Sequence, residues 1–327
     1  MMREMIRSAV RTLVPLSLLV AAIVILFGPQ TGAQSYASGQ QVWTAYEGWE
    51  HAADGGFDFL FGYMNDNWEE ELDVPIGPEN NLQPGGPDLG QPTHFLPRRN
   101  RFIFRVHVGK DFGDKEMVWT LTTKGKTSKA YATLRTDSLI ENIDIMSETG
   151  ALGPGVSNPE LRADKAPVIK IEGEKTRRAK VGEPLSLVAL VSDDNIPRSR
   201  SNQSPSGVPA RGAAPAPGAA PAPARPPVFI PPSRITVGKT MGLHVAWFVY
   251  RGAGKVTFEP QQVKVWEDTR AGTNSPWAPL WTPPQLPPDG RWTAQVTFDS
   301  PGTYVLRARA DDGALTDDDQ LMVSVTR

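Results

Sequence analysis

Short strand-like runs, each closed by Gly, Pro or Asp, are the feature that most limits what this chain can fold into. Among 327 residues there are 31 prolines and 30 glycines, and they recur between apolar stretches of only a few residues. From Pro167 onward we find no convincing amphipathic helix. Such punctuation is typical of antiparallel sheets and argues against alternating strands and helices. The sequence therefore predicts an all-β protein.

The C-terminal half predicts one sandwich. We expect its strands at Val168–Ile171, Leu185–Val191, Leu243–Tyr250, Val263–Trp266, Trp292–Phe298, Thr303–Ala310 and Leu321–Thr326. Apolar residues alternate within these runs, so that Trp247 and its next-but-one neighbours share one face, as do Tyr304 and Leu306 on another strand. We expect the two faces to meet in a core. Seven strands match the count of an immunoglobulin-like domain.

A second β-sandwich-like module is predicted in the N-terminal half. Its expected strands are Phe57–Met64, Arg101–Val108, Met117–Thr123 and Ala130–Leu134. Between the first two, the prolines of Val74–Pro97 exclude a helix or a central strand and predict a long loop.

These patterns give a domain organisation. We expect a signal segment at 1–33, an N-terminal β-sandwich-like domain at 36–135, a linker at 136–165 and an Ig-like sandwich at 166–327. A Pro/Ala-rich insertion at 197–232, including AAPAPGAAPAPARPP, interrupts the last domain. Its composition cannot build a core and favours polyproline II, so we interpret it as a solvated spacer, with a partner-docking segment as the alternative.

The first residues predict export. Arg3, Arg7 and Arg11 precede the apolar run Leu13–Phe27, and Thr31-Gly32-Ala33 supplies the small residues of a cleavage site before Gln34. The alternative is an uncleaved anchor, because the apolar run is nearly long enough to span a bilayer. Both interpretations place everything after Ala33 outside the cytoplasm, in the periplasm, at the cell surface or secreted. Membrane attachment is then expected only through this segment.

Composition excludes several classes of function. The chain has no cysteine, which removes disulfides, thiolate nucleophiles and Cys-ligated zinc. The net charge of −2 and the dispersed basic residues argue against a nucleic-acid partner. A cysteine-free exported sandwich has to hold together by apolar burial alone.

Two stretches carry a family resemblance. VAWFVYRGAGKVTF at 245–258 and PGTYVLRARADDG at 301–313 resemble the PKD and related Ig-like repeats of bacterial surface proteins. By analogy with immunoglobulin domains, Trp247 would be the core tryptophan and Tyr304 the tyrosine corner. Ala189 and Leu306 would then stand at the two cysteine positions. In the N-terminal half, YEGWEH and GQPTHFLPRRNRFIFRV resemble an uncharacterised family of exported bacterial proteins, which implies no activity.

Acidic pairs at the ends of two predicted strands are the candidate metal ligands. Calcium takes six to eight oxygen ligands, and loops at one pole of a sandwich can supply them. The candidates are Asp193, Asp194, Asp311 and Asp312. The alternative is ordinary turn chemistry, in which each carboxylate accepts bonds from its own backbone and Gly313 takes a positive φ. Apart from calcium, the sequence implies no cofactor.

No catalytic constellation is recognisable. There is no G-x-S-x-G motif, and His51, His94 and His107 lack the spacing of zinc ligands. We interpret His107 as a solvated surface residue. The aromatic residues near the start of the first module are predicted to be mostly core.

We therefore expect a non-catalytic exported protein that serves in binding, adhesion or envelope scaffolding, with a protein or glycan ligand. The alternative is a secreted enzyme or accessory subunit, in which acidic residues of 69–73 form a cleft with His51 or His94. Convergence of these side chains in one pocket would favour the enzyme.

Overall fold

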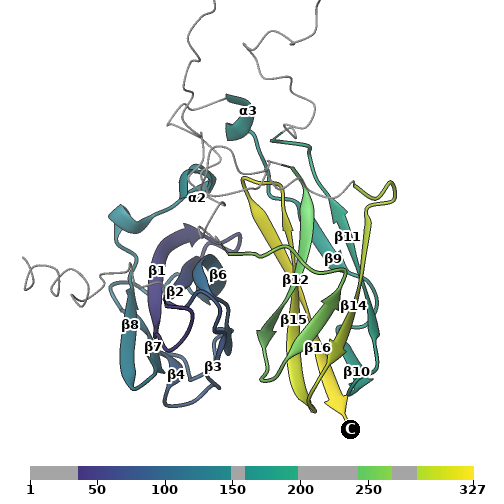
Figure 1. The fold of residues 1–327 in the computed structure, drawn as a ribbon. Coiled ribbons are helices and arrows are strands. Elements are labelled where there is room, and N and C mark those ends of the chain that lie inside the picture. The colour runs from purple at the N-terminus through teal and green to yellow at the C-terminus, as the bar shows by residue number, and fades with distance from the viewer. Residues whose placement is uncertain (1–35, 149–158, 198–241, 267–285) are drawn as a thin grey trace, which may run out of the picture. The chain divides into compact units, whose positions relative to one another are not determined.

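The computed structural model describes residues 36–148, 159–197, 242–266 and 286–327 (Figure 1). These residues form an all-β fold of five sheets with short helical segments, as predicted. Among them we find no helix that is long and apolar enough to cross a bilayer. The predicted signal segment and nearly all of the Pro/Ala-rich insertion lie outside the described residues. The predicted domain boundaries stay a prediction.

Eight strands precede the connector. They are β1 (Val42–His51), β2 (Phe57–Asn65), β3 (Leu72–Asp73), β4 (Asn80–Gln83), β5 (His94–Phe95), β6 (Arg98–Val108), β7 (Met117–Thr123) and β8 (Lys126–Ala132). They form two three-stranded sheets, β1-β2-β6 and β4-β7-β8, and the ribbon β3-β5. The predicted loop 74–97 therefore contains two short strands, and β4 lies at a sheet edge, where flanking prolines are tolerated.

Aromatic packing joins these sheets. Phe61 stacks on Phe104 at 5.1 Å between ring centroids, and Trp119 lies edge-on to Phe104 at 5.0 Å. Side chains also fasten the backbone of β1 to the second sheet. Thr123 Oγ1 accepts a hydrogen bond from Val42 N at 2.9 Å. Strand β1 was not predicted, because its apolar and polar residues do not alternate cleanly.

The connector carries short helical segments and leads into the second set of strands. The helical segments are η1 (Thr136–Ser138), α2 (Asn142–Glu148) and α3 (Pro159–Arg162). The strands are β9 (Val168–Ile171), β10 (Thr176–Lys180), β11 (Leu185–Ser192), β12 (His244–Arg251), β13 (Val256–Glu259), β14 (Arg291–Phe298), β15 (Gly302–Asp311) and β16 (Thr316–Thr326). They form two four-stranded sheets, β10-β16-β15-β12 and β13-β14-β11-β9.

The core of this sandwich follows the predicted alternation. Trp247 and Leu306 come from one sheet and Ala189 from the other, and all three are buried in the same apolar cluster. Ala189 and Leu306 thus contribute apolar packing at the positions that the immunoglobulin resemblance assigns to the disulfide. Each large apolar side chain buried in this way contributes about 1.5–3 kcal/mol.

One predicted strand, Val263–Trp266, is wrong. Strand β13 ends at Glu259 and is followed by Pro260, which has no N–H to donate. The side chain of Gln262 then accepts the hydrogen bond of Trp247 N at 3.0 Å, which occupies a β12 amide that a further strand would need. Another strand, β10, escaped prediction because it is largely charged. It pairs in parallel with β16 as an edge.

Strand β12 is buried on both faces. Trp247 and Val249 point into the sandwich core, whereas Phe248 and Tyr250 belong to the apolar cluster of the first set of strands. Thr93 N donates to Tyr250 O at 3.3 Å, and Arg251 forms a two-bond ion pair with Asp88. This double burial explains the almost continuous apolar run of β12.

Tyr304 gives the first test of the fold. Its ring is fully buried, and its hydroxyl lies 2.9 Å from both Ser300 O and Ala253 O, as in a tyrosine corner. We expect Tyr304→Phe to lower the free energy of unfolding by about 1–2 kcal/mol, because the two carbonyl groups lose the single hydroxyl donor that they share. Urea denaturation measures this. Tyr131→Phe, at a residue 53% exposed on β8, is the control and should change nothing measurable.

Candidate functional site

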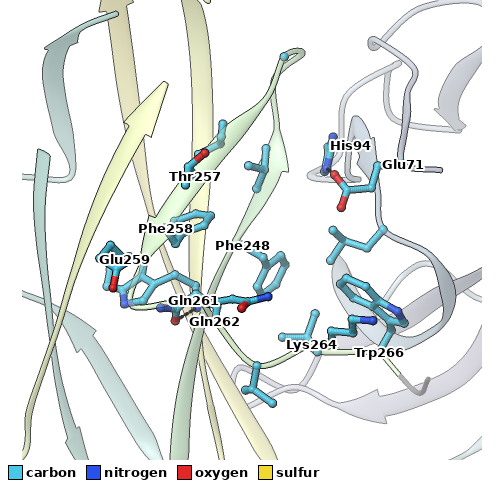
Figure 2. Close-up of a pocket in the computed structure, with 17 residues that line it drawn as sticks. Glu71, His94, Phe248, Thr257, Phe258, Glu259, Gln261, Gln262, Lys264 and Trp266 are labelled. Carbon is cyan, nitrogen blue, oxygen red and sulfur yellow. Dashed lines mark hydrogen bonds and ion pairs between the residues drawn. The ribbon is translucent and has the colours of Figure 1, made fainter. Parts of the chain in front are cut away.

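A pocket of about 470 Å³ opens beside β12 and β13 (Figure 2). One wall is made by β12, β13 and the segment 261–266 that follows them, and the other by Glu71, His94 and Leu96. The volume falls within the range of small-ligand sites, about 300–1,000 Å³. The lining combines aromatic and aliphatic side chains with two amides, Gln261 and Gln262, and two carboxylates, Glu71 and Glu259.

Segment 261–266 is held in place by one glutamine. Gln262 Oε1 accepts from the backbone of β12, and Gln262 Nε2 donates to Pro260 O. The segment ends in Trp266, whose ring has Lys264 Nζ 5.6 Å from its centroid. Within the described part of the chain, Trp266 Nε1 is buried and has no hydrogen-bond partner. A buried indole N–H normally finds an acceptor, so this donor is an exception in the pocket wall.

The opposite wall contains a buried, doubly paired histidine. His94 is 6% exposed, and its Nδ1 lies 2.8 Å from Asp73 Oδ1 while its Nε2 lies 3.0 Å from Glu71 Oε2. Burial by itself would lower the pKa of His94. The hydrogen bonds to Asp73 and Glu71 outweigh it and raise this pKa to about 9. At neutral pH the ring is therefore an imidazolium with both nitrogens occupied, and it is unsuited to accept a proton as a general base.

The expected acidic cleft forms only in part. Glu71, Asp73 and His94 converge, but Glu70 instead pairs with Lys124 at 2.6 Å, and His51 lies against the rings of Trp49 and Phe57. His107 is 49% exposed beside Asp54 and Asp58, so its predicted surface position is confirmed.

The four calcium candidates all take part in turn chemistry. Asp193 and Asp194 accept from Asn195 N and Ile196 N, at 2.8 and 2.9 Å. Asp311 Oδ1 accepts from Gly313 N at 2.7 Å, and Asp312 Oδ1 accepts from two amides beyond it. In the described ranges, no three His, Cys, Asp or Glu side chains are gathered as a ready set of metal ligands.

Two acidic residues of β16 form hydrogen bonds with the backbone of another strand. Asp317 Oδ2 accepts from Ile169 N at 3.1 Å, and Asp319 Oδ2 accepts from Ile171 N at 2.7 Å. They satisfy amides of the edge strand β9. Strand β16 begins five residues before its predicted start because Thr316 and the residues after it pair with the end of β15.

The predicted core role of the early aromatic residues holds for some of them. Tyr63 and Trp49 are buried, whereas Trp43 is 46% exposed and Trp68 lies under the Arg98 guanidinium at 4.1 Å. The sequence analysis missed Phe258 and Trp266 as pocket residues. The one sequence feature that could have indicated this wall is the pair of glutamines at 261–262, because their polar amides interrupt the apolar pattern expected of a strand.

Neither a protein-family model nor a curated protein matches this chain. Solved structures with a similar arrangement include the eight N-terminal Ig domains of Down Syndrome Cell Adhesion Molecule, at 7% identity and a TM-score of 0.22, with 88% of this chain and 27% of that chain covered. The S-layer protein rSbsC(31-844) is 6% identical, with a TM-score of 0.23 and 88% and 28% covered.

The D00-D0 domain of intimin is 10% identical, with a TM-score of 0.22 and 86% of this chain and 99% of that chain covered. The chain thus spans about a quarter of the length of the first two structures. With TM-scores of 0.22 to 0.23, these three likenesses carry no argument about this chain.

His94 gives a test of the pocket wall. Because its pKa is raised above its ordinary value of 6.5, its charged form stabilises the fold fully below about pH 6.5 and loses that effect as the pH rises through about 9. His94→Gln should therefore lower the free energy of unfolding, measured by urea denaturation, more at about pH 6 than at about pH 10, with a loss of roughly 2–3 kcal/mol at the lower pH. Asp73→Asn removes one of the two acceptors that raise the pKa of His94. In this variant the loss of stability with rising pH should therefore begin at a lower pH than in the wild type. An equal loss for His94→Gln at all pH values would contradict the paired imidazolium.

Proposed function

We propose that this protein is a non-catalytic binding or scaffolding protein of the extracytoplasmic space, and that its ligand site is the pocket of β12, β13 and segment 261–266. The observation that carries the proposal is the chemistry of that pocket. Apolar aromatic walls surround the carboxamide of Gln261 and an indole N–H that has no hydrogen-bond partner among the described residues, a combination that suits a stacking ligand with hydrogen-bond acceptors.

Two ligand classes fit this chemistry. A sugar can stack its apolar face on Phe258 or Trp266 and present hydroxyl groups to Gln261, and a peptide can offer carbonyl oxygens to the same donors. Both are consistent with a protein or glycan partner outside the cell. The exported location rests on the arginine-flanked apolar segment 13–27 and on the small residues before Gln34.

The bacterial surface setting rests on the PKD-like stretches at 245–258 and 301–313. Because fold by itself does not define activity, this resemblance supports the setting and not a particular ligand. A scaffolding role is also compatible with a sandwich that is held together without a disulfide.

The non-catalytic part of the proposal rests on His94. A histidine held between Asp73 and Glu71 has no ring nitrogen free to take a proton from a substrate. Among the described residues that line the pocket there is no serine or cysteine nucleophile. The cationic His94 ring instead bonds to the carboxylates of Asp73 and Glu71 and so fixes this wall of the pocket.

A direct test is a screen of the purified full chain against glycan and peptide arrays, followed by titration of the best ligand. We expect Trp266→Ala to weaken binding at least about tenfold, since an aromatic anchor in a ligand site contributes about 2 kcal/mol or more. Trp43→Ala is the control, because Trp43 is a tryptophan 46% exposed on β1 and does not line the pocket. Its binding should equal that of the wild type.

Two results would overturn the proposal. If Trp266→Ala binds the ligand as the wild type does, the pocket is not the site. If the bound ligand is released chemically altered, and Glu71→Gln abolishes that conversion, the enzyme alternative holds instead.

A further inference from the structure

Strand β13 lies at an open edge of the second sandwich. It pairs with β14 on one side, and among the described residues no strand pairs with its other side. All four residues of β13 line the pocket, whereas no residue of β14 does. Figure 2 shows Thr257, Phe258 and Glu259 along this strand. The open edge of β13 therefore borders the pocket.

The ladder between β13 and β14 fixes which backbone groups point to this edge. Asp299 N donates to Lys255 O at 3.1 Å, so Lys255 faces β14. Bonded residues recur at every second position of an antiparallel pair, and Thr257 therefore faces β14 as well. The N–H and C=O groups of Val256 and Phe258 point the other way. In the described part of the chain no hydrogen bond reaches them.

The other edges of this sandwich are covered. On β9, the outward amides donate to two aspartates of β16. On β12, Trp247 N donates to Gln262 and Tyr250 O accepts from Thr93. Strand β10 is rich in arginine and lysine, which discourage further pairing. Strand β13 has neither kind of cover, and Pro260, which lacks an N–H, ends the stretch that can pair.

We infer that the pocket binds an extended peptide, which adds to β13 as an antiparallel strand. This inference rests on the proposed function and names the ligand class of the same pocket. On one side of an extended peptide, N–H and C=O groups recur at every second residue, as they do at Val256 and Phe258. A glycan does not repeat such groups at this spacing. The open edge therefore favours the peptide over the sugar.

The two faces of β13 define the side chains of the peptide. Val256 and Phe258 pack against the apolar core, so the peptide residues opposite them should be apolar. Thr257 and Glu259 are exposed on the other face. A threonine suits the first of these, and a lysine or arginine opposite Glu259 forms a cross-strand charge pair. Written from its N-terminus, the expected peptide is Lys-Val-Thr-Val.

The experiment uses a fluorescent, end-blocked peptide of about eight residues built around Lys-Val-Thr-Val, titrated with the purified full chain and followed by anisotropy. Backbone N-methylation of both valines should weaken binding at least about tenfold, because their two N–H groups face β13. N-methylation of the lysine and the threonine is the matched control. Those N–H groups face solvent, so this peptide should bind like the unmodified one.

A charge exchange tests the register. Glu259→Lys should weaken binding of the lysine peptide by about two- to fivefold, and a peptide with glutamate in place of that lysine should recover the loss. Glu183→Lys is the control, because Glu183 is an exposed acid between β10 and β11 that does not line the pocket. This variant should bind the lysine peptide like the wild type.

Hydrogen exchange with mass spectrometry measures the backbone pairing itself. Saturation with the peptide should slow exchange at the amides of Val256 and Phe258, because each gains an acceptor. A ligand held by side chains alone leaves these amides exposed.

Three outcomes would overturn the inference. They are equal binding of the two N-methylated peptides, unchanged exchange of β13 at saturation, and a screen in which only glycans bind. If Trp266→Ala still weakens the ligand that does bind, the pocket remains the site and strand addition alone is wrong. A dimer in sedimentation velocity with β13 protected in the absence of peptide would also overturn it, because a second copy would then occupy the edge.

Discussion

The packing of two four-stranded sheets on each other, without any covalent cross-link, is the interaction on which the rest of this structure depends. Leu187 and Ala189 of β11 and Leu306 and Ala308 of β15 are completely buried in the shared core. Since the chain contains no cysteine, this apolar contact has to hold the two sheets together. Because β12 stays fixed in that core, its other face can pack on the first set of strands and support one wall of the pocket.

Much of this fold could be predicted from the sequence, because alternation reports which face of a strand is buried. The positions of Trp247, Tyr304 and Leu306 followed from that rule and from the immunoglobulin resemblance. The rule fails where a side chain, and not a neighbouring strand, accepts the hydrogen bond of a backbone amide, as Gln262 does from Trp247 N. It also fails for charged edge strands such as β10, whose pairing is set by its partner β16.

The candidate sites were less predictable, because they depend on distances between loops. The sequence placed Asp193 and Asp312 near one pole, since both follow strands of the sandwich. The pairing of His94 with Glu71 and Asp73 was not predicted: it arises from the two-residue ribbon β3-β5, of which only β5 lies within the segment predicted to be a loop. Local sequence patterns cannot predict which side chains from distant segments come into contact, because tertiary packing decides those contacts.

Amide hydrogen exchange of the purified chain, read out by mass spectrometry in chelator, tests the central role of the sheet packing. Amides in the most deeply packed elements open only with global unfolding and exchange most slowly. In the second sandwich, β11, β14 and β15 should exchange most slowly, and the edge strands β9, β10 and β13 should exchange faster. Fast exchange of β11 and β15, with protection confined to the first set of strands, would contradict the account.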